Sequence, residues 1–193
     1  MEPSDEVLCQ RVAGGEEAAF DLLVTRYQKR AWRLAWNVLR DAEEARDASQ
    51  EAFVRLYRAA GQFGGRAKFS TWFYRVLVNV CLEHRRKHRW WRHIFTSAAA
   101  DASAASDDDE GSSVERHPSP AVDVLGMIGR EQTLTRVQAA MDRLSPQQRA
   151  ALTLQLDDVP TAEIAEALRC SEATVRVHLH RALTTLRKIA ENA

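Results

Sequence analysis

The chain has 193 residues, of which 45% are hydrophobic and 28% charged, and this composition is typical of a globular protein with one or two domains. Its formal net charge of +0 hides a segregation, because residues 1–95 carry 17 Lys and Arg against 12 Asp and Glu, whereas residues 96–140 carry 3 against 8. No apolar run approaches the ~20 residues that span a bilayer, and the acidic start MEPSDEVLCQ lacks the pattern of a secretory signal, so we expect a cytoplasmic protein without membrane insertion.

The N-terminal part of the chain predicts three helices. A short helix over residues 5–12 ends at Gly14-Gly15, and the next segment repeats apolar residues at three- and four-residue spacing, the period of one helix face. These residues are Phe20, Leu23, Tyr27, Ala31, Leu34 and Val38. Asp41 is the predicted N-cap of a third helix, with Glu44 three residues on. The inward face of this third helix is predicted to hold Ala45, Ala48, Ala52, Leu56 and Ala60.

The segment KFSTWFYRVLVNVCLEHRRKHRWWRH, residues 68–93, combines aromatic residues with a basic end. Ser70 is the predicted N-cap, and the predicted inward face holds Phe73, Val76 or Leu77, Val80 and His84. Arg75, Asn79 and Arg86 follow the opposite face, and Trp72 lies at the border between the two. A basic groove beside aromatic side chains is the chemistry that holds single-stranded nucleic acid. A membrane-surface anchor at residues 85–93 is disfavoured, because the apolar face is needed for the core.

The middle of the chain predicts a linker between two helical domains. Residues 96–121 are rich in Ala, Ser and Asp, with SDDDEGSS at their centre, a composition that does not bury enough apolar surface to order a segment. We therefore expect an N-terminal domain over residues 1–95, a disordered acidic linker over 96–121 and a C-terminal domain over 122–193. The fold class is expected to be all-α, since no segment shows the alternation of a strand.

The C-terminal domain predicts a helix-turn-helix over residues 161–187. A helix before it starts at Ser145, Pro146 and Gln148, the pattern of a capping box. Thr161 and Ser171 are the predicted caps of the two motif helices, joined by a turn at Arg169-Cys170. The buried residues are expected to be Ile164, Ala165 and Leu168 of the first helix and Val175, Leu179, Leu183 and Leu186 of the second. The outer face of the second helix would then meet base edges and phosphates in the major groove.

These motifs resemble known transcription proteins. The segment 161–188, with the preceding LSPQQRAALTLQL, resembles region 4 of bacterial sigma factors of the extracytoplasmic-function (ECF) group of the sigma-70 family, and also the DNA-binding domain of LuxR-type regulators. DAEEARDASQEAFVRLYRA (41–59) resembles the region 2.2 helix of the sigma group, and FGGRAKFSTWFYRVLVNVCLEHRRK (63–87) resembles its regions 2.3 and 2.4. The chain is therefore identified as a suspected ECF sigma factor, with the LuxR-like regulator carrying an unrelated N-terminal domain kept as the alternative.

The resemblance implies partners and site residues. An alternative sigma factor binds core RNA polymerase through the clamp helices and the flap, binds promoter DNA, and is commonly controlled by an anti-sigma factor. The implied polymerase-binding residues are Asp41, Glu43, Asp47, Gln50, Glu51, Phe53 and Arg55. Those implied for the −10 element and its melting are Phe63, Lys68, Phe69, Ser70, Thr71, Trp72, Arg75, Asn79 and Arg86. Those implied for the −35 element are Ser171, Glu172, Thr174, Arg176, Val177, His178, His180 and Arg181.

Other site classes are not supported by the sequence. The cysteines Cys9, Cys81 and Cys170 are far apart, and no Cys/His cluster has metal-ligand spacing. No nucleophile–base pair or phosphate loop is visible, so we expect no enzyme, no cofactor, no metal and no small-molecule substrate. Ser49 departs from the aliphatic residue usual in the family, and Val177-His178 replace a polar pair, which predicts an apolar contact to a thymine methyl group. The acidic run 107–110 is either a spacer or a mimic of nucleic acid.

Overall fold

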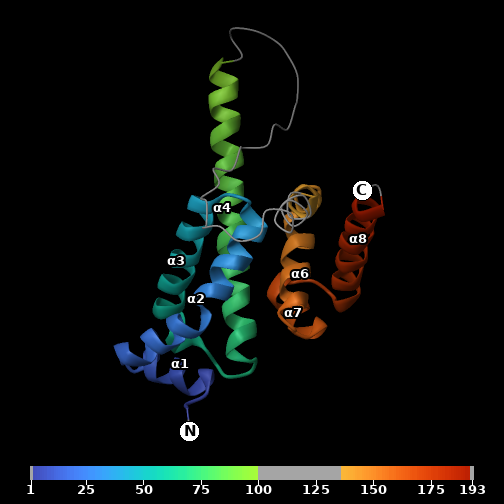
Figure 1. The fold of residues 1–193 in the computed structure, drawn as a ribbon. Coiled ribbons are helices and arrows are strands. Elements are labelled where there is room, and N and C mark those ends of the chain that lie inside the picture. Colours follow the sequence, from blue (N-terminus) through green and yellow to red (C-terminus); the bar gives the residue numbers. More distant parts are fainter. Residues whose placement is uncertain (1, 100–135, 192–193) are drawn as a thin grey trace, which may run out of the picture.

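Four helices build the N-terminal domain in the computed structural model, which describes residues 2–99 and 136–191, with side chains for residues 2–88 and 136–188. They are α1 (Asp5–Ala13), α2 (Glu17–Leu39), α3 (Ala42–Ala59) and α4 (Phe69–Ala99), with the short 3-10 helix η1 (Ala60–Gln62) after α3. α2, α3 and α4 pack against one another, and the C-terminal half of α4 extends beyond the other helices of this domain (Figure 1). No strand occurs in the described ranges, so the predicted all-α class is confirmed.

The predicted start of α3 is confirmed, whereas the predicted N-cap of α4 was wrong. The side chain of Asp41 accepts a hydrogen bond from the Glu44 N–H at 2.9 Å, which confirms Asp41 as the N-cap of α3. α4 begins at Phe69, so Ser70 is inside the helix and does not cap it. The carboxylate of Glu6 in α1 accepts the Phe69 N–H at 3.1 Å instead. A tertiary contact therefore supplies the cap that we expected from the local sequence.

α4 is longer than the sequence predicted. It runs to Ala99, four residues past the predicted end of the domain, and Thr96–Ala99 were expected to belong to the linker. Ala is the best helix former, which favours continuation through this end of the segment. The rest of the predicted linker, including the acidic run 107–110, lies outside the described residues.

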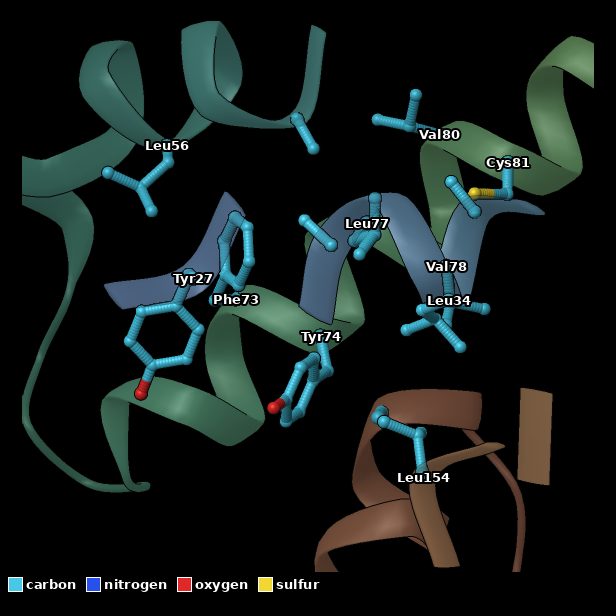
Figure 2. Close-up of a cluster of buried hydrophobic side chains, with 14 of the residues drawn as sticks. Tyr27, Leu34, Leu56, Phe73, Tyr74, Leu77, Val78, Val80, Cys81 and Leu154 are labelled. Atoms are coloured by element: carbon cyan, nitrogen blue, oxygen red, sulfur yellow. The ribbon is translucent and has the colours of Figure 1, made fainter. Parts of the chain in front are cut away.

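Aromatic rings fill the centre of the N-terminal domain. Tyr27 of α2 contacts Phe69, Phe73 and Tyr74 of α4, with ring centroids 5.3, 5.3 and 6.3 Å away. The Tyr27 hydroxyl donates to Asp5 of α1 at 2.6 Å, so its polar atom is satisfied inside the core. Figure 2 shows the rings of Tyr27, Phe73 and Tyr74 near aliphatic residues of α2 and α4 such as Leu34 and Leu77. The inward faces predicted for α2 and α3 are confirmed, apart from Phe20, which is half-buried.

The C-terminal domain contains a helical stretch at residues 136–142 followed by α6 (Pro146–Leu156), α7 (Thr161–Leu168) and α8 (Glu172–Glu191). The capping box at Ser145 is confirmed: the Ser145 hydroxyl accepts the Gln148 N–H at 3.3 Å, and Gln148 Oε1 accepts the Ser145 N–H at 2.8 Å. Ser171 accepts the Thr174 N–H at 3.1 Å and caps α8 as predicted.

Two predictions within the helix-turn-helix were wrong. Thr161 is the first residue of α7, and Pro160 precedes it as the N-cap without a side-chain hydrogen bond. Leu183 is 53% exposed, whereas Ala182 is fully buried. The inward stripe of α8 passes through Val175 and Ala182, which are buried, and Leu179 and Leu186, which are half-buried, and Leu183 lies one position beside it. Leu168 of α7, also predicted to be buried, is half-buried.

The two domains pack against each other, and we call this packing the closed arrangement. α6 contacts α2, and α7 contacts α4 (Figure 1). Leu154 of α6 and Ile164 of α7 belong to the same apolar cluster as Leu34 and Val78 of the N-terminal domain, and Figure 2 shows Leu154 from the C-terminal domain below Leu34. The sequence predicted two domains but not this shared core.

Candidate functional site

The outward face of α3 carries an acidic stripe that ends in apolar residues. Asp41, Glu43, Asp47 and Gln50, all predicted to bind polymerase, are exposed. Val54 continues the stripe two turns after Asp47 and is 46% exposed, and Tyr57 is exposed beyond it. Sequence reasoning missed Val54 and Tyr57, although their spacing from Gln50 is that of one helix face. Val54 and Tyr57 therefore add apolar surface beside the charges of α3.

Other residues predicted for polymerase binding lie on the inner side of α3. Phe53 is buried and its ring centroid lies 5.0 Å from that of Phe73, so it holds α3 to α4. Glu51 accepts hydrogen bonds from Arg55 Nε at 2.9 Å and shares one with His84 Nε2 at 2.8 Å. These bonds, chiefly that of His84, hold the pKa of the Glu51 carboxyl below its usual value. Arg55 also donates to Glu83 at 2.6 Å. Glu51 and Arg55 therefore join α3 to α4.

The residues predicted for the −10 element fall into a buried and an exposed group. Phe69 and Thr71 are buried, and Phe63, Ser70 and Trp72 are half-buried. The Trp72 ring lies 5.3 Å from Phe63 and 6.1 Å from Phe69, so Phe69 supports the two aromatic residues that retain exposed surface. Trp72 thus lies at the border of the core, where the sequence placed it.

The two arginines of this group lie on the exposed side of α4. Arg75 and Arg86 are exposed, and Asn79 between them is half-buried. Lys68 and Thr71 meet the C-terminal domain: Glu163 of α7 accepts from Lys68 Nζ at 2.6 Å and from the Thr71 hydroxyl at 2.7 Å. α7 therefore contacts one end of the predicted DNA surface. The side chains of Trp90 and Trp91 lie outside those that the structure describes.

The second helix of the helix-turn-helix presents a polar face. Glu172, Arg176, Val177, His180 and Arg181 are exposed, as predicted. Arg176 donates to Glu172 one turn earlier at 3.0 Å, which orients its guanidinium along the face. Ser171 is exposed, whereas Thr174 and His178 are half-buried. His178 Nδ1 is buried and has no hydrogen-bond partner among the described residues.

Other kinds of site are not found in the parts of the chain that the structure describes. No group of three or more His, Cys, Asp or Glu residues there is placed to hold a metal ion. No helix among the same residues is long and apolar enough to span a membrane. Burial raises the pKa of the Cys9 thiol to about 11 and that of Cys81 to about 12, so these two cysteines are unreactive core residues at neutral pH.

Family models match both domains. Sigma-70 region 2 matches residues 23–91, and Sigma-70 region 4 matches residues 134–186. The first match decides against the LuxR-like interpretation, which required an unrelated N-terminal domain.

Curated relatives match nearly the whole chain. The RNA polymerase sigma-H factor of Pseudomonas aeruginosa is 33% identical over 188 residues, which cover 95% of this chain and 92% of that protein. The ECF RNA polymerase sigma-E factor of Escherichia coli K12 is 32% identical over 93% of this chain and 90% of that protein. SigM of Mycobacterium tuberculosis, also an ECF sigma factor, is 31% identical over 97% and 85%.

Two solved structures share the fold. One is CnrH in complex with the cytosolic domain of CnrY, with a TM-score of 0.67 and 19% identity over 98% of this chain and 99% of that one. The other is the sigma factor RpoE of Bartonella quintana in complex with the anti-sigma factor NepR, with a TM-score of 0.64 and 17% identity over 89% and 96%.

Proposed function

Because this chain belongs to the ECF group of the sigma-70 family and is an alternative sigma factor, we propose that its two domains divide promoter recognition between them. Members of this family are transcription initiation factors and not enzymes. The single observation that carries the proposal is the presence of region 2 and region 4 in this order in one chain, each with an exposed face of the chemistry its task requires. We place the protein in the cytoplasm, where RNA polymerase works.

The acidic stripe of α3 is the surface we assign to core RNA polymerase. Asp41, Glu43, Asp47 and Gln50 supply charge and hydrogen bonds, and Val54 supplies apolar area at the end of the stripe. Charged residues at the rim of an interface speed association, whereas an apolar residue near its centre contributes affinity. Phe53, Glu51 and Arg55 act indirectly, because they fix α3 on α4.

The two DNA-facing surfaces have different chemistry. The α4 surface pairs Arg75, Arg86 and Asn79 with the half-buried Trp72, which suits an unpaired strand of the −10 element. The α8 surface carries Arg176 and Arg181 beside Val177, which suits the major groove of the −35 element. Flipping a base out of the duplex costs a few kcal/mol. We therefore expect that the protein is held by polymerase and by the −35 element before the −10 element melts.

The same fold occurs in two solved complexes: CnrH is bound to the cytosolic domain of CnrY, and the sigma factor RpoE is bound to the anti-sigma factor NepR. We propose that this chain is likewise controlled by an anti-sigma factor. In this packing Glu163 of α7 accepts hydrogen bonds from Lys68 and Thr71, two residues of the predicted DNA surface, so we infer that the domains separate when this surface binds DNA.

Run-off transcription tests the function. Purified core RNA polymerase, the full chain and a template carrying the region upstream of its own gene should yield a discrete transcript that is absent without the chain. Replacing Arg176 by Ala should weaken recognition by about tenfold at one position of the −35 element, since one bidentate base contact is worth ~1–3 kcal/mol. A discrete transcript that forms equally well without the chain would contradict the proposal.

A further inference from the structure

α1 contacts the loop between α3 and α4 at both of its ends. At the start of the loop, η1 packs against α1. At its end, the carboxylate of Glu6 in α1 accepts the backbone N–H of Phe69, the first residue of α4, at 3.1 Å. The match to Sigma-70 region 2 begins at residue 23, so α1 lies outside that match. A helix outside the matched segment therefore supports the loop that carries Phe63 and Lys68.

The middle of this loop is open. It contains Gly64 and Gly65, and a Cβ added at either would meet no atom of the described residues within 4 Å, apart from those of its chain neighbours. Gly65 has a φ of 66°, a conformation that glycine adopts without steric cost. Glycine backbone also has more conformational freedom than that of other residues. We therefore expect the position of Phe63 to depend on the supports at the two ends of the loop.

The first turn of α4 joins the loop to the aromatic residues of the predicted −10 surface. The Trp72 N–H bonds to the Lys68 carbonyl at 3.1 Å, which closes this turn. The ring centroid of Phe69 lies 6.1 Å from that of Phe63 and 6.1 Å from that of Trp72, and the last two are 5.3 Å apart. Fraying of the turn would therefore change the position of Trp72 relative to Phe63.

The charge of Glu6 suits the start of α4. The first N–H groups of a helix lack intrahelical partners, and the helix dipole favours a carboxylate beside them. The Phe69 N–H is the main cause that holds the pKa of the Glu6 carboxyl below its usual value. Leu8 and Cys9 of α1 are fully buried in the core, so the helix that carries Glu6 is itself anchored. Glu6 and Phe69 both belong to the N-terminal domain, so their bond does not require the closed arrangement.

We propose that Glu6 is a positioning residue for promoter opening, and that its bond to Phe69 holds Phe63 and Trp72 where an unpaired base of the −10 element stacks. Glu6 acts through the start of α4 and does not touch DNA in this role. A surface that already has its binding conformation loses less entropy when it binds. The inference rests on the proposed promoter function and adds α1 to the elements that serve it.

Two substitutions separate the reach of the Glu6 side chain from its charge. Glu6→Asp keeps the charge and suits the first turn of a helix, but its carboxylate is one methylene shorter and should not reach the Phe69 N–H. Glu6→Gln keeps the length and an acceptor oxygen and loses the charge. We expect Glu6→Asp to slow promoter opening by about fivefold, because a helix cap is lost, and Glu6→Gln to stay within about twofold of wild type. Glu17→Asp, at an exposed position in the first turn of α2, is the matched control and should open the promoter at the wild-type rate.

Stopped-flow fluorescence measures opening by the holoenzyme, reconstituted from core RNA polymerase and the full chain. The template is the region upstream of its own gene, with a fluorescent adenine analogue in the −10 element. The affinity for core polymerase and the promoter affinity before the strands separate are measured alongside. Both should be unchanged in Glu6→Asp, whereas a general loss of structure would lower them together with the opening rate.

Three results would overturn the role of Glu6: opening by Glu6→Asp at the wild-type rate, opening by Glu6→Gln as slow as that by Glu6→Asp, or an equal loss of both affinities and the opening rate. In each of these cases wild type still opens the promoter, so the promoter function stands. Failure of the wild-type holoenzyme to open the promoter would instead contradict the promoter function, and this inference with it.

Discussion

Arg149 joins two helix ends through one side chain. Its guanidinium donates to the carbonyl of Met141, in the last turn of the helical stretch 136–142, at 3.2 Å and to that of Leu144, just after the stretch, at 2.8 Å; it also donates to the Val38 carbonyl near the end of α2 at 2.9 Å. Helix ends leave carbonyls without intrahelical partners, and buried carbonyls are costly when unpaired. Arg149 satisfies such groups on both sides of the domain interface, which explains a charged residue in the core.

Replacing Arg149 should therefore destabilise the fold. Arg149→Met fills a similar volume but leaves three carbonyls without this donor, and we expect it to lower the free energy of unfolding by about 3 kcal/mol. Arg149→Lys should recover only part of this loss, because an ammonium group lacks the guanidinium fork. Urea denaturation followed by circular dichroism measures both. Arg187→Met, at an exposed position of α8, is the control and should change stability by less than about 0.5 kcal/mol. An Arg149→Met variant as stable as this control would contradict the argument.

Helix starts followed from the sequence where the capping side chain lies three residues from the N–H group whose hydrogen bond it accepts. Asp41 and Ser145 were identified as caps because their side chains bond to nearby N–H groups, which is a local property. The start of α4 was misplaced because Glu6, far away in sequence, caps it. Ser49, which stands where the family usually has an aliphatic residue, is buried, and its hydroxyl donates to the Ala45 carbonyl at 2.6 Å within the same helix. The sequence therefore predicted a helix start correctly where the capping side chain lies close to it in the chain, and incorrectly where the cap comes from a distant helix.

The exposed end of α3 allows a test of the polymerase surface at the scale of one helix. Val54→Ser removes apolar area from the stripe, and we expect about fivefold weaker binding to core RNA polymerase. Stability should hardly change, because Val54 is 46% exposed in the free protein. Val7→Ser is the matched control: Val7 is 45% exposed on α1, away from the stripe. Competition against a labelled sigma factor, read by fluorescence anisotropy, measures the affinity. Equal affinities of the two variants would remove Val54 from the interface.

The arrangement of the two domains was beyond sequence reasoning. Ile164 was predicted to be buried, and it is, but its apolar cluster includes residues of α2 and α4. Periodicity identifies a buried face without identifying what covers it. Lys68 and Thr71 were assigned to DNA from the family pattern, and in the closed arrangement both bond to Glu163. The same polar groups that suit a phosphate backbone also suit a carboxylate, so residue type alone did not distinguish the two partners.

Opening of the whole molecule should be controlled in part by Glu163. Glu163→Lys removes the acceptor for Lys68 and Thr71 and places two ammonium groups close together, so the domains should separate more readily. We expect tighter binding of a single-stranded −10 oligonucleotide, by about fivefold, in the absence of polymerase. Glu166→Lys is the matched control, since it makes the same charge change at an exposed position of α7. Fluorescence anisotropy at several salt concentrations separates the two effects, because general attraction to DNA falls steeply with salt. If both variants gained the same affinity, net charge would explain the result and the Glu163 contacts would not restrain the closed arrangement.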